Sequence, residues 1–354
     1  MSSPLHGLKV LDFSSLLPGP YATALLADMG AEILRIDSPE RQDMVKSVKP
    51  AFKDSSYAYL TLHRNKQSCT LDLKQPAAIE QIKALLTEYD ILVEQFRPGV
   101  MAKLGLDYDT LSAINPKLIY CSISGYGQTG TYKDKAGHDI NYLALSGLAS
   151  FSGTKETGPV LSGTQIADIA GGSHHAVMAI LAAVIQRSQT GQGQYLDISM
   201  TDAAFALTGI FGAGAVAAGI DPGPGETLLN GGSFYGYYQT LDNRYLAVGS
   251  LEPKFARIFF QTLGHDNWLE RAFSSDSKQQ TLLKQDIAEI IRQKTLEHWL
   301  SLFKPLDACV EPVLTVSEAA RSALMAERNM TTEISLETGE TVRQITSAIK
   351  FSKS

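Results

Sequence analysis

The first forty residues alternate short apolar runs with a helical pattern of apolar positions. Residues 9–13 (KVLDF) and 31–36 (AEILRI) are predicted as buried strands, and residues 21–29 between them have the spacing of a helix. Gly30 follows the helical pattern directly, as is typical of the residue that ends a helix. This order predicts a βαβ unit, the building block of a parallel sheet with helices on both faces.

The same alternation of strands and helices continues to residue 199. Further strands are expected at residues 69–73, 91–93, 118–122 and 195–199, and helices at residues 76–87, 100–104, 109–114 and 168–186. Strands and helices at this spacing predict an α/β fold with an open parallel sheet. The turn after the first strand reads SSLLPGP and not GxGxxG, so we expect no NAD or FAD.

The pattern changes near residue 211, where Gly, Ala and Pro become frequent over residues 211–233. This composition predicts a linker or hinge. A hairpin over residues 234–248 and three helices after it predict a smaller α+β domain. We therefore expect a large domain of residues 1–205 and 325–354, a linker of residues 206–232, a small domain of residues 233–310 and a return linker of residues 311–324.

Composition excludes some functional classes and leaves others open. The formal net charge of -6 argues against general nucleic-acid binding, although local Arg and Lys could still bind a small anion. The three cysteines, Cys69, Cys121 and Cys309, are widely spaced and form no metal-binding pattern, which favours a reduced, cytoplasmic location. The longest apolar run, residues 176–185, is shorter than a bilayer requires, so we expect no membrane insertion.

The candidate chemistry lies between residues 124 and 173, where His138 and Asp168 are the two groups of interest. An imidazole and a carboxylate near one carbon could remove a proton and return one. Each has a plainer interpretation, because His138 could be a structural loop residue and Asp168 a helix N-cap. Asp139 could orient the imidazole or cap the helix that starts at residue 140.

Two adjacent histidines, His174 and His175, follow Asp168 on the same predicted helix. Adjacent residues on a helix point about 100° apart, so this pair cannot readily share one metal ion. We expect no metal site, and we expect the two side chains to serve helix packing.

Several segments together resemble the class III CoA-transferase family, the carnitine/bile-acid-inducible group. In chain order they read PGPYATALLADMGAEILRID, NKQSCTLDLK, VEQFRPGVMAKLGLDYDTL, YCSISGYGQTG, GHDINYLALSGL, ADIAGG, GQGQYLDISM and IKFS. The resemblance extends from residue 18 to residue 352. It implies a Rossmann-like large domain, a smaller α+β domain, an interlocked homodimer and an acyl-CoA substrate, with no cofactor besides the coenzyme A of the substrate.

The resemblance also implies how the chemistry divides within the family. Transferases use an aspartate that the donor acylates, and Asp168 matches it. Racemases use the matching aspartate with the histidine of a GHDINY segment, which this chain carries at residues 137–142. Formyl/oxalate transferases carry a glycine-rich loop that NGGSF, residues 230–234, matches poorly.

The resemblance therefore favours racemisation of 2-methylacyl-CoA thioesters, with an acyl-CoA:carboxylate CoA-transferase as the alternative. A CoA-binding protein without catalysis is a third interpretation, which the intact pair of His138 and Asp168 argues against. In the racemase, an enolate forms, and we expect its oxygen to bind a backbone N–H near residues 168–169, at the start of a helix.

The remaining site residues also follow from the resemblance. Glu252 resembles a racemase glutamate that reaches the site from the small domain of the other chain, although it could equally be the N-terminal charge of a helix. Basic residues are expected to bind the phosphates of CoA, and two residues of the GHDINY segment are expected near the substrate. The residues assigned to substrate and CoA binding are Arg35, Arg64, Lys66, Arg97, Asp139 and Tyr142.

Overall fold

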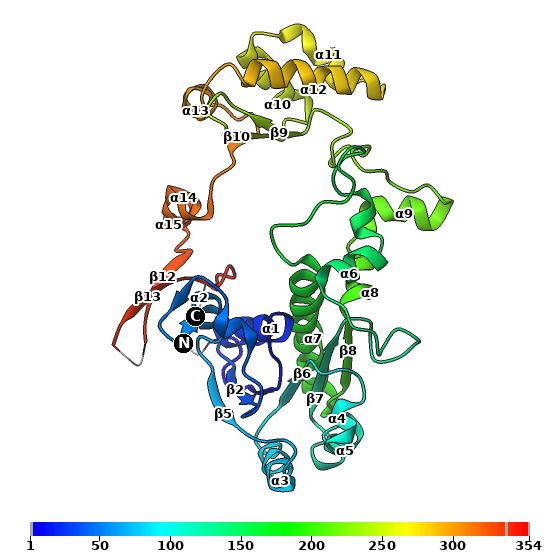
Figure 1. Ribbon diagram of the computed structural model, residues 1–354, viewed down its shortest axis with the longest axis vertical. Helices are drawn as coiled ribbons and strands as arrows, with labels where there is room; N and C mark the ends of the chain where they lie inside the picture. The colour runs from blue at the N-terminus through cyan, green and yellow to red at the C-terminus, as the bar shows by residue number, and fades with distance from the viewer. Residues whose placement is uncertain (1–2, 337–338, 353–354) are drawn as a thin grey trace. The chain divides into compact units, whose positions relative to one another are not determined.

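A computed structural model of the chain describes residues 3–336 and 339–352 (Figure 1). It contains two compact units. The first takes in residues 3–146, residues 162–207 and the described part of residues 329–354, and the second takes in Gly147–Leu161 and Thr208–Arg328. Residues 147–161 thus group with the second unit, although they were assigned to the large domain. The boundaries given above stay a prediction.

A six-stranded parallel sheet organises the first unit, in the order β5-β2-β1-β6-β7-β8. Its strands are β1 (Lys9–Asp12), β2 (Glu32–Asp37), β5 (Gln67–Thr70), β6 (Ile91–Glu94), β7 (Ile119–Ser124) and β8 (Tyr195–Ser199). Numbered along the chain, these strands lie in the order 3-2-1-4-5-6, which is that of the Rossmann fold. The predicted α/β class is confirmed. The third strand starts two residues earlier than expected, because Gln67 pairs with Leu34.

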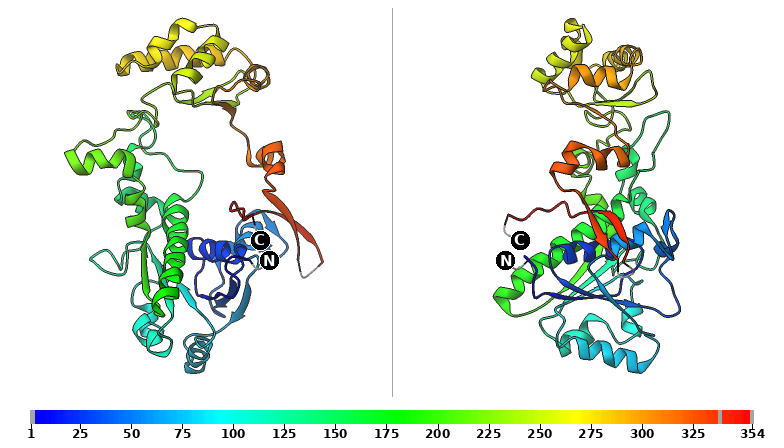
Figure 2. Two further views of the ribbon diagram at one scale, coloured as in Figure 1. Left: turned by 180° about the vertical axis from the view of Figure 1, so that it is seen from behind. Right: turned by 90° about the vertical axis from the view of Figure 1, so that its left-hand side faces the viewer.

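Helices cover both faces of this sheet, as the views in Figure 2 show. Val10, Ile33 and Val93 pack in one cluster with residues of α1 (Pro18–Asp28) and α7 (His175–Thr190). The alternate residues Leu11 and Leu92 pack in another cluster with residues of α3 (Pro76–Leu85), α4 (Val100–Lys103) and α5 (Tyr108–Ile114). Both faces are buried because side chains alternate along each strand.

The other elements of the first unit are short. They are the 3-10 helix η1 (Met44–Ser47), α2 (Tyr57–Leu62), α6 (Asp139–Leu145), the π-helix η3 (Ala167–His174), α8 (Met200–Ala206) and two antiparallel pairs, β3 (Ala51–Phe52) with β4 (Ser55–Ser56) and β12 (Thr331–Ser335) with β13 (Thr341–Ile345). Among them, α6 and η3 carry the residues on which the functional argument depends.

The second unit has an antiparallel sheet in the order β11-β10-β9, and aromatic residues such as Phe259 and Trp299 fill its core. Its elements are η2 (Leu148–Phe151), α9 (Gly209–Ala218), β9 (Gly236–Gln239), β10 (Tyr245–Val248), α10 (Pro253–Leu263), η4 (Asp266–Trp268), α11 (Leu269–Ala272), α12 (Ser277–Ile291), α13 (Leu296–Phe303), β11 (Val310–Pro312), α14 (Val316–Arg321) and α15 (Ala323–Glu327). The predicted hairpin and three helices are present. Part of the predicted linker is helical in α9, since four alanines offset its glycines.

The helices η3 and α7 run on as one helix, Ala167–Thr190, which is long and apolar enough to cross a membrane. The prediction that the longest apolar segment is too short to span a bilayer is therefore wrong. The pair of Met200–Ala206 and Gly209–Ala218 passes the same test if it is taken as one span. In this structure Ala176, Val177 and Ile180 are buried in the core. Because buried core helices also pass this test, the absence of membrane insertion stays a prediction.

A buried polar network fixes the turn between β1 and α1. Asp12 is fully buried and accepts hydrogen bonds from the Ser14 N–H at 2.9 Å and the Thr23 hydroxyl at 2.5 Å. The ammonium of Lys66 donates to Thr23 Oγ1 at 2.7 Å and to the Pro20 carbonyl at 2.8 Å. Gly19 is the second residue of α1, directly after this turn, and its N–H donates to Gln95 Oε1 at 2.9 Å. The start of α1 and the loop after β6 are thereby tied together.

Replacing Gly19 with alanine should destabilise the first unit. An added Cβ would lie 2.2 Å from the Cβ of Ser14, which the network holds in place. We expect Gly19→Ala to lower the free energy of unfolding by about 1–3 kcal/mol, as overpacking does. Urea denaturation followed by circular dichroism measures this loss. Gly163→Ala is the matched control, because an added Cβ there meets nothing within 4 Å, and equal stability of both variants would contradict the account.

Candidate active site

A cavity of about 690 Å³ opens at the carboxyl ends of β1, β6 and β7. In an open parallel sheet ligands bind where the strand order reverses, which here lies between β1 and β6. The walls come from the loops after these strands and from α6. The lining residues that the argument uses are Phe96, Arg97, His138, Asn141, Tyr142 and Met200.

His138 immediately precedes α6, and its side chain is exposed at the wall of this cavity. Its N–H donates to Asn141 Oδ1 at 3.0 Å, and its carbonyl accepts from the Asn141 N–H at 2.8 Å. The Tyr142 hydroxyl donates to the Gly137 carbonyl at 2.6 Å. Backbone bonds on both sides therefore hold the residue, while the imidazole stays accessible from the cavity.

Asp139 joins His138 to Asp168. Its side chain is 7% exposed, and its Oδ1 accepts a hydrogen bond from the Asp168 N–H at 3.0 Å. This contact links α6 to η3 and corresponds to neither of the two roles proposed for Asp139 from the sequence. The Ile169 N–H donates to the Gln165 carbonyl at 3.0 Å. The two amides expected to bind an enolate oxygen thus already have acceptors in this structure.

The ionisable groups around Asp168 interact electrostatically. The pKa of Asp168 is raised to about 6, mainly by burial and also by the nearby Asp139 carboxylate, while His138 opposes the shift. Burial and then Asp168 raise the pKa of Tyr142 to about 12. The structure therefore brings His138, Asp139, Tyr142 and Asp168 into one electrostatic neighbourhood. A carboxyl group with a pKa near 6 beside an imidazole can act as base or acid near neutral pH.

Two glycines explain why η3 lies where it does. An added Cβ on Gly172 would lie 3.0 Å from the Pro18 Cβ and 3.2 Å from the Met200 Cγ. An added Cβ on Gly171 would lie 3.2 Å from the Met200 carbonyl oxygen. The pair lets η3 approach the starts of α1 and α8 closely. Asp168 is thus held in a π-helical turn, a geometry often found at functional sites.

Of the four basic residues assigned to CoA, only Arg97 lines the large cavity. Arg35, Arg64 and Lys66 line a separate cavity of about 320 Å³. Arg64 pairs with Asp28, and burial lowers the pKa of Lys66, which lies in the polar network around Asp12, to about 8.

Arg35 retains unused hydrogen-bonding capacity. It donates to Asp37 and to the Tyr59 hydroxyl, each at 2.5 Å. Its Nε and Nη1 are buried and have no partner among the residues that the structure describes. These two donors suit an anion better than the engaged ammonium of Lys66 does.

Sequence reasoning missed three other basic residues of the large cavity, Arg41, Lys133 and Lys135. Arg41 lies in a polar stretch that gave no signal. Lys133 and Lys135 stand directly before the GHDINY segment, and this position next to His138 was the signal that could have identified them.

Glu252 belongs to the second unit. It precedes α10, and its carbonyl accepts from the N–H groups of Phe255 at 3.0 Å and Ala256 at 2.9 Å. This describes its backbone role at the helix start. A role for its carboxylate at the site of another chain stays a prediction.

The residues that the structure describes contain no group of three or more His, Cys, Asp or Glu side chains that could hold a metal ion. His175 Nδ1 lies 2.7 Å from the Ala170 carbonyl, and the His174 ring lies 6.0 Å from that of Tyr21. His175 is partly buried, as the packing role expected from the sequence requires, whereas His174 is exposed, so the packing prediction is wrong for His174. The lack of a metal in the reaction stays a prediction.

Three comparisons with known proteins agree on the family. Residues 5–354 match CoA-transferase family III. Alpha-methylacyl-CoA racemase of Homo sapiens is 36% identical over 326 residues, covering 92% of this chain and 81% of the racemase. Succinyl-CoA:glutarate CoA-transferase of Mus musculus is 29% identical over 361 residues, covering 99% of this chain and 81% of the transferase. The crystal structure of a CAIB/BAIF family protein from Brucella suis superimposes with a TM-score of 0.85 at 27% identity. The match covers 100% of this chain and 94% of the Brucella chain.

The family expected from the ordered sequence segments is confirmed by these matches, which extend over both units. Relatives with two different activities match over most of the chain. The comparisons therefore establish the substrate class without deciding between racemisation and CoA transfer. The chain belongs to CoA-transferase family III and is an enzyme that acts on acyl-CoA thioesters.

Proposed function

We propose that the protein is a racemase of 2-methylacyl-CoA thioesters that works by 1,1-proton transfer. The observation that carries this proposal is the electrostatic interaction of Asp168 with His138, which lines the cavity at the switch point of the sheet. A transferase needs the carboxylate alone, whereas a racemase needs a second acid–base group on the opposite face of the substrate carbon. Similarity to the human racemase supports the same reaction.

In this mechanism one group removes the α-proton of the thioester and the other returns a proton to the opposite face. The intermediate is an enolate, whose oxygen needs hydrogen-bond donors. The Asp168 and Ile169 amides are occupied. The N–H groups of Asp139 and Ile140, which open α6 beside His138, have no acceptor among the described residues and are the better candidates.

The acyl-CoA is proposed to bind in the large cavity. Arg97, with Arg41, Lys133 and Lys135, supplies positive charge for its phosphates. Arg35 could supply further donors from the separate cavity that it lines, while Arg64 and Lys66 are engaged within the protein. Tyr142 lines the cavity directly. The carboxylate of Asp139 is proposed to act on the substrate only through Asp168.

The second candidate is an acyl-CoA:carboxylate CoA-transferase. Its support is Asp168 itself, a half-buried carboxylate that could attack a thioester carbonyl, together with the match to the mouse transferase. The Asp168 carboxylate would displace CoA thiolate from the donor thioester, and the thiolate would then attack the aspartyl carbonyl of the mixed anhydride and release the donor acid. The acceptor carboxylate would attack the resulting aspartyl-CoA thioester and again release CoA thiolate. This thiolate would attack the acceptor acyl carbon of the second anhydride, which forms the new acyl-CoA and frees Asp168. His138 would have only a supporting role.

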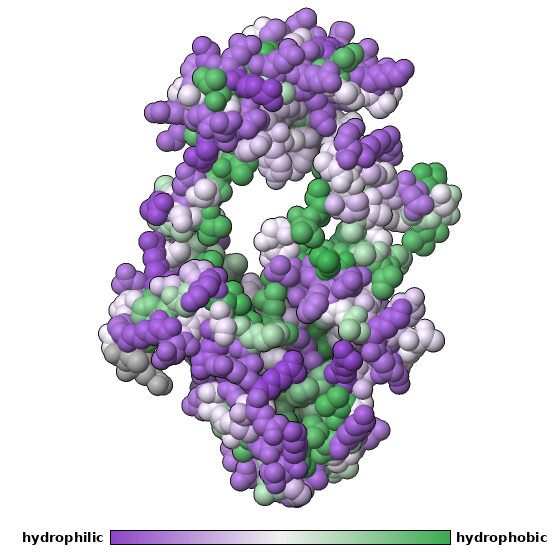
Figure 3. Space-filling model, viewed as in Figure 1, coloured by the Kyte–Doolittle hydropathy of each residue, from purple (hydrophilic) through white to green (hydrophobic). Residues whose placement is uncertain are grey.

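We further propose that the enzyme is a cytoplasmic, interlocked homodimer that binds neither nucleic acid nor membrane. Large apolar side chains on and beside α9 are strongly exposed, with Ile210 at 82%, Val216 at 72% and Ile220 at 69%. Figure 3 shows apolar surface gathered over α9. A patch of this kind favours burial against another protein surface.

If the protein is a racemase, it should catalyse hydrogen isotope exchange at the α-carbon without an acceptor acid. In heavy water, a 2-methylacyl-CoA should take up deuterium at its α-carbon when no carboxylate acid is present, as mass spectrometry can measure. His138→Ala and Asp168→Ala should each reduce this rate at least about 100-fold, because general acid–base groups contribute that much. His6→Ala is the control, because His6 is exposed and does not line the cavity. Transfer of CoA to an added acid with no uptake of label would contradict the proposal.

The pH profile separates the two mechanisms. A racemase is active when the pair of His138 and Asp168 holds one proton, so kcat/KM should be bell-shaped and alike for both enantiomers. With the pKa of Asp168 raised to about 6, kcat/KM should fall about tenfold per unit below pH 6. Steady-state kinetics from pH 4 to 9 measure this. A plateau that persists above pH 6 would indicate a nucleophilic Asp168 instead.

Mixed dimers test which chain of the dimer supplies Glu252 to the site that contains His138. We expect His138→Ala and Glu252→Gln each to inactivate the homodimer. If each site takes His138 from one chain and Glu252 from the other, the co-expressed mixed dimer regains one intact site, about half of the wild-type activity. Differently tagged chains allow its purification. No recovery, or a monomeric mass by light scattering, would contradict the arrangement.

A further inference from the structure

Three polar side chains stand in one row across neighbouring strands, and the first of them is the last residue of its strand. Glu94 on β6 pairs in register with Ser122 on β7, and Ser122 pairs with Asp197 on β8. Leu92, two residues before Glu94, packs with the helices α3 to α5. Because side chains two apart share a face, the row lies on the face of the sheet opposite α1 and α7.

Glu94 is the buried acidic member of this row, with an exposed fraction of 4%. Burial raises its pKa to about 7. A carboxyl group at a buried sheet position has a desolvation cost that an apolar side chain would avoid. The group does make contacts that no apolar side chain could make, since its Oε2 accepts the Phe96 N–H at 2.7 Å and the carboxyl group also forms a hydrogen bond with the Ser122 side chain.

This contact holds a turn of the substrate cavity. Residues 95–98 follow β6 and all line the 690 Å³ cavity. The Gln95 side chain accepts a hydrogen bond from the Gly19 N–H at 2.9 Å, which holds the start of the turn. The Glu94 carboxyl group accepts a hydrogen bond from the Phe96 N–H, which holds the next residue of the turn. Arg97 comes directly afterwards, so the position of this guanidinium depends on a backbone anchored at two points.

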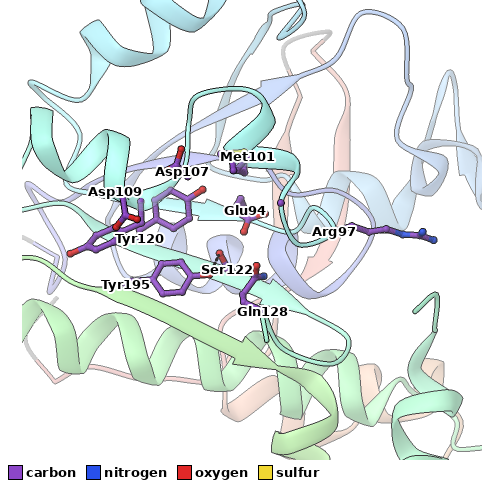
Figure 4. Close-up of a pocket in the computed structure, with 12 residues that line it drawn as sticks. Glu94, Arg97, Met101, Asp107, Asp109, Tyr120, Ser122, Gln128 and Tyr195 are labelled. Carbon is purple, nitrogen blue, oxygen red and sulfur yellow. Dashed lines mark hydrogen bonds between the residues drawn. The ribbon is translucent and has the colours of Figure 1, made fainter. Parts of the chain in front are cut away.

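The carboxyl group of Glu94 faces a different cavity, of about 300 Å³, behind the turn. Figure 4 shows it pointing toward Ser122 and Gln128 among the lining residues. Arg97 lines both cavities. Glu94 therefore lies directly behind the substrate cavity and reaches it only through the turn.

We propose that Glu94 is a positioning residue for acyl-CoA binding, which fixes the turn of residues 95–98 and thereby Arg97 through its bond to the Phe96 N–H. The inference rests on the proposed binding of acyl-CoA in the large cavity. Since Glu94 touches neither the α-carbon nor His138 and Asp168, its loss acts on affinity and not on proton transfer.

The test compares two variants by calorimetry with 2-methylpropanoyl-CoA as the probe. Glu94→Leu keeps the buried volume and removes the acceptor, so Kd should rise about tenfold, the equivalent of one hydrogen bond to a carboxylate. Glu94→Gln keeps an oxygen for the Phe96 N–H and should restore the wild-type Kd within about twofold. The kcat for α-deuterium exchange should change less than about twofold in both variants.

Tyr195→Phe is the matched control, because it removes the hydroxyl that donates to Ser122 at 3.1 Å in the same cavity and leaves the turn untouched. Its Kd should equal that of the wild type. A folded Glu94→Leu variant with wild-type Kd, or a Glu94→Gln variant as weak as Glu94→Leu, overturns the inference. A wild-type protein that does not bind the probe overturns instead the proposed function on which it rests.

Discussion

The hydrogen bond from the Asp168 N–H to the Asp139 carboxylate is the contact on which the site depends. It joins α6 to η3, two elements 29 residues apart in sequence, and so brings the imidazole that precedes α6 near the carboxyl group at the start of η3. Asp139 is buried, and a buried carboxylate needs donors. The bond therefore gives the buried Asp139 carboxylate a hydrogen-bond donor, and it also sets the spacing between His138 and Asp168.

The same arrangement accounts for the electrostatics of the site. Burial in the π-helical turn is the main cause that raises the pKa of Asp168, and the nearby Asp139 carboxylate raises it further. The close approach of η3 to α1 and α8, which Gly171 and Gly172 permit, is the source of that burial. A carboxyl group of this kind is suited to proton exchange and could also become a nucleophile, which explains why one scaffold can host both reactions of the family.

Positive charge near the sheet has two different functions. Lys66 and Arg64 neutralise Asp12 and Asp28 within the protein, so their charges stabilise the fold. Arg97 has no such partner among the described residues and lines the cavity. Glu94, a buried acid, contributes by fixing the backbone that carries Arg97. The charge of a side chain thus says less about ligand binding than the ion-pair and hydrogen-bond partners that the fold places beside it.

The sequence by itself determined the order of strands and helices in the first unit and the identity of the candidate acid–base groups. Apolar periodicity and helix ends are local features, and the GHDINY segment is a local motif, so residues such as His138 could be identified without a structure. Only the tertiary structure decided that Asp139 binds the Asp168 amide, that Lys66 is internal and that Glu94 is buried. These outcomes depend on which distant strands and loops become neighbours, because desolvation and hydrogen-bond partners are set by packing and not by sequence spacing.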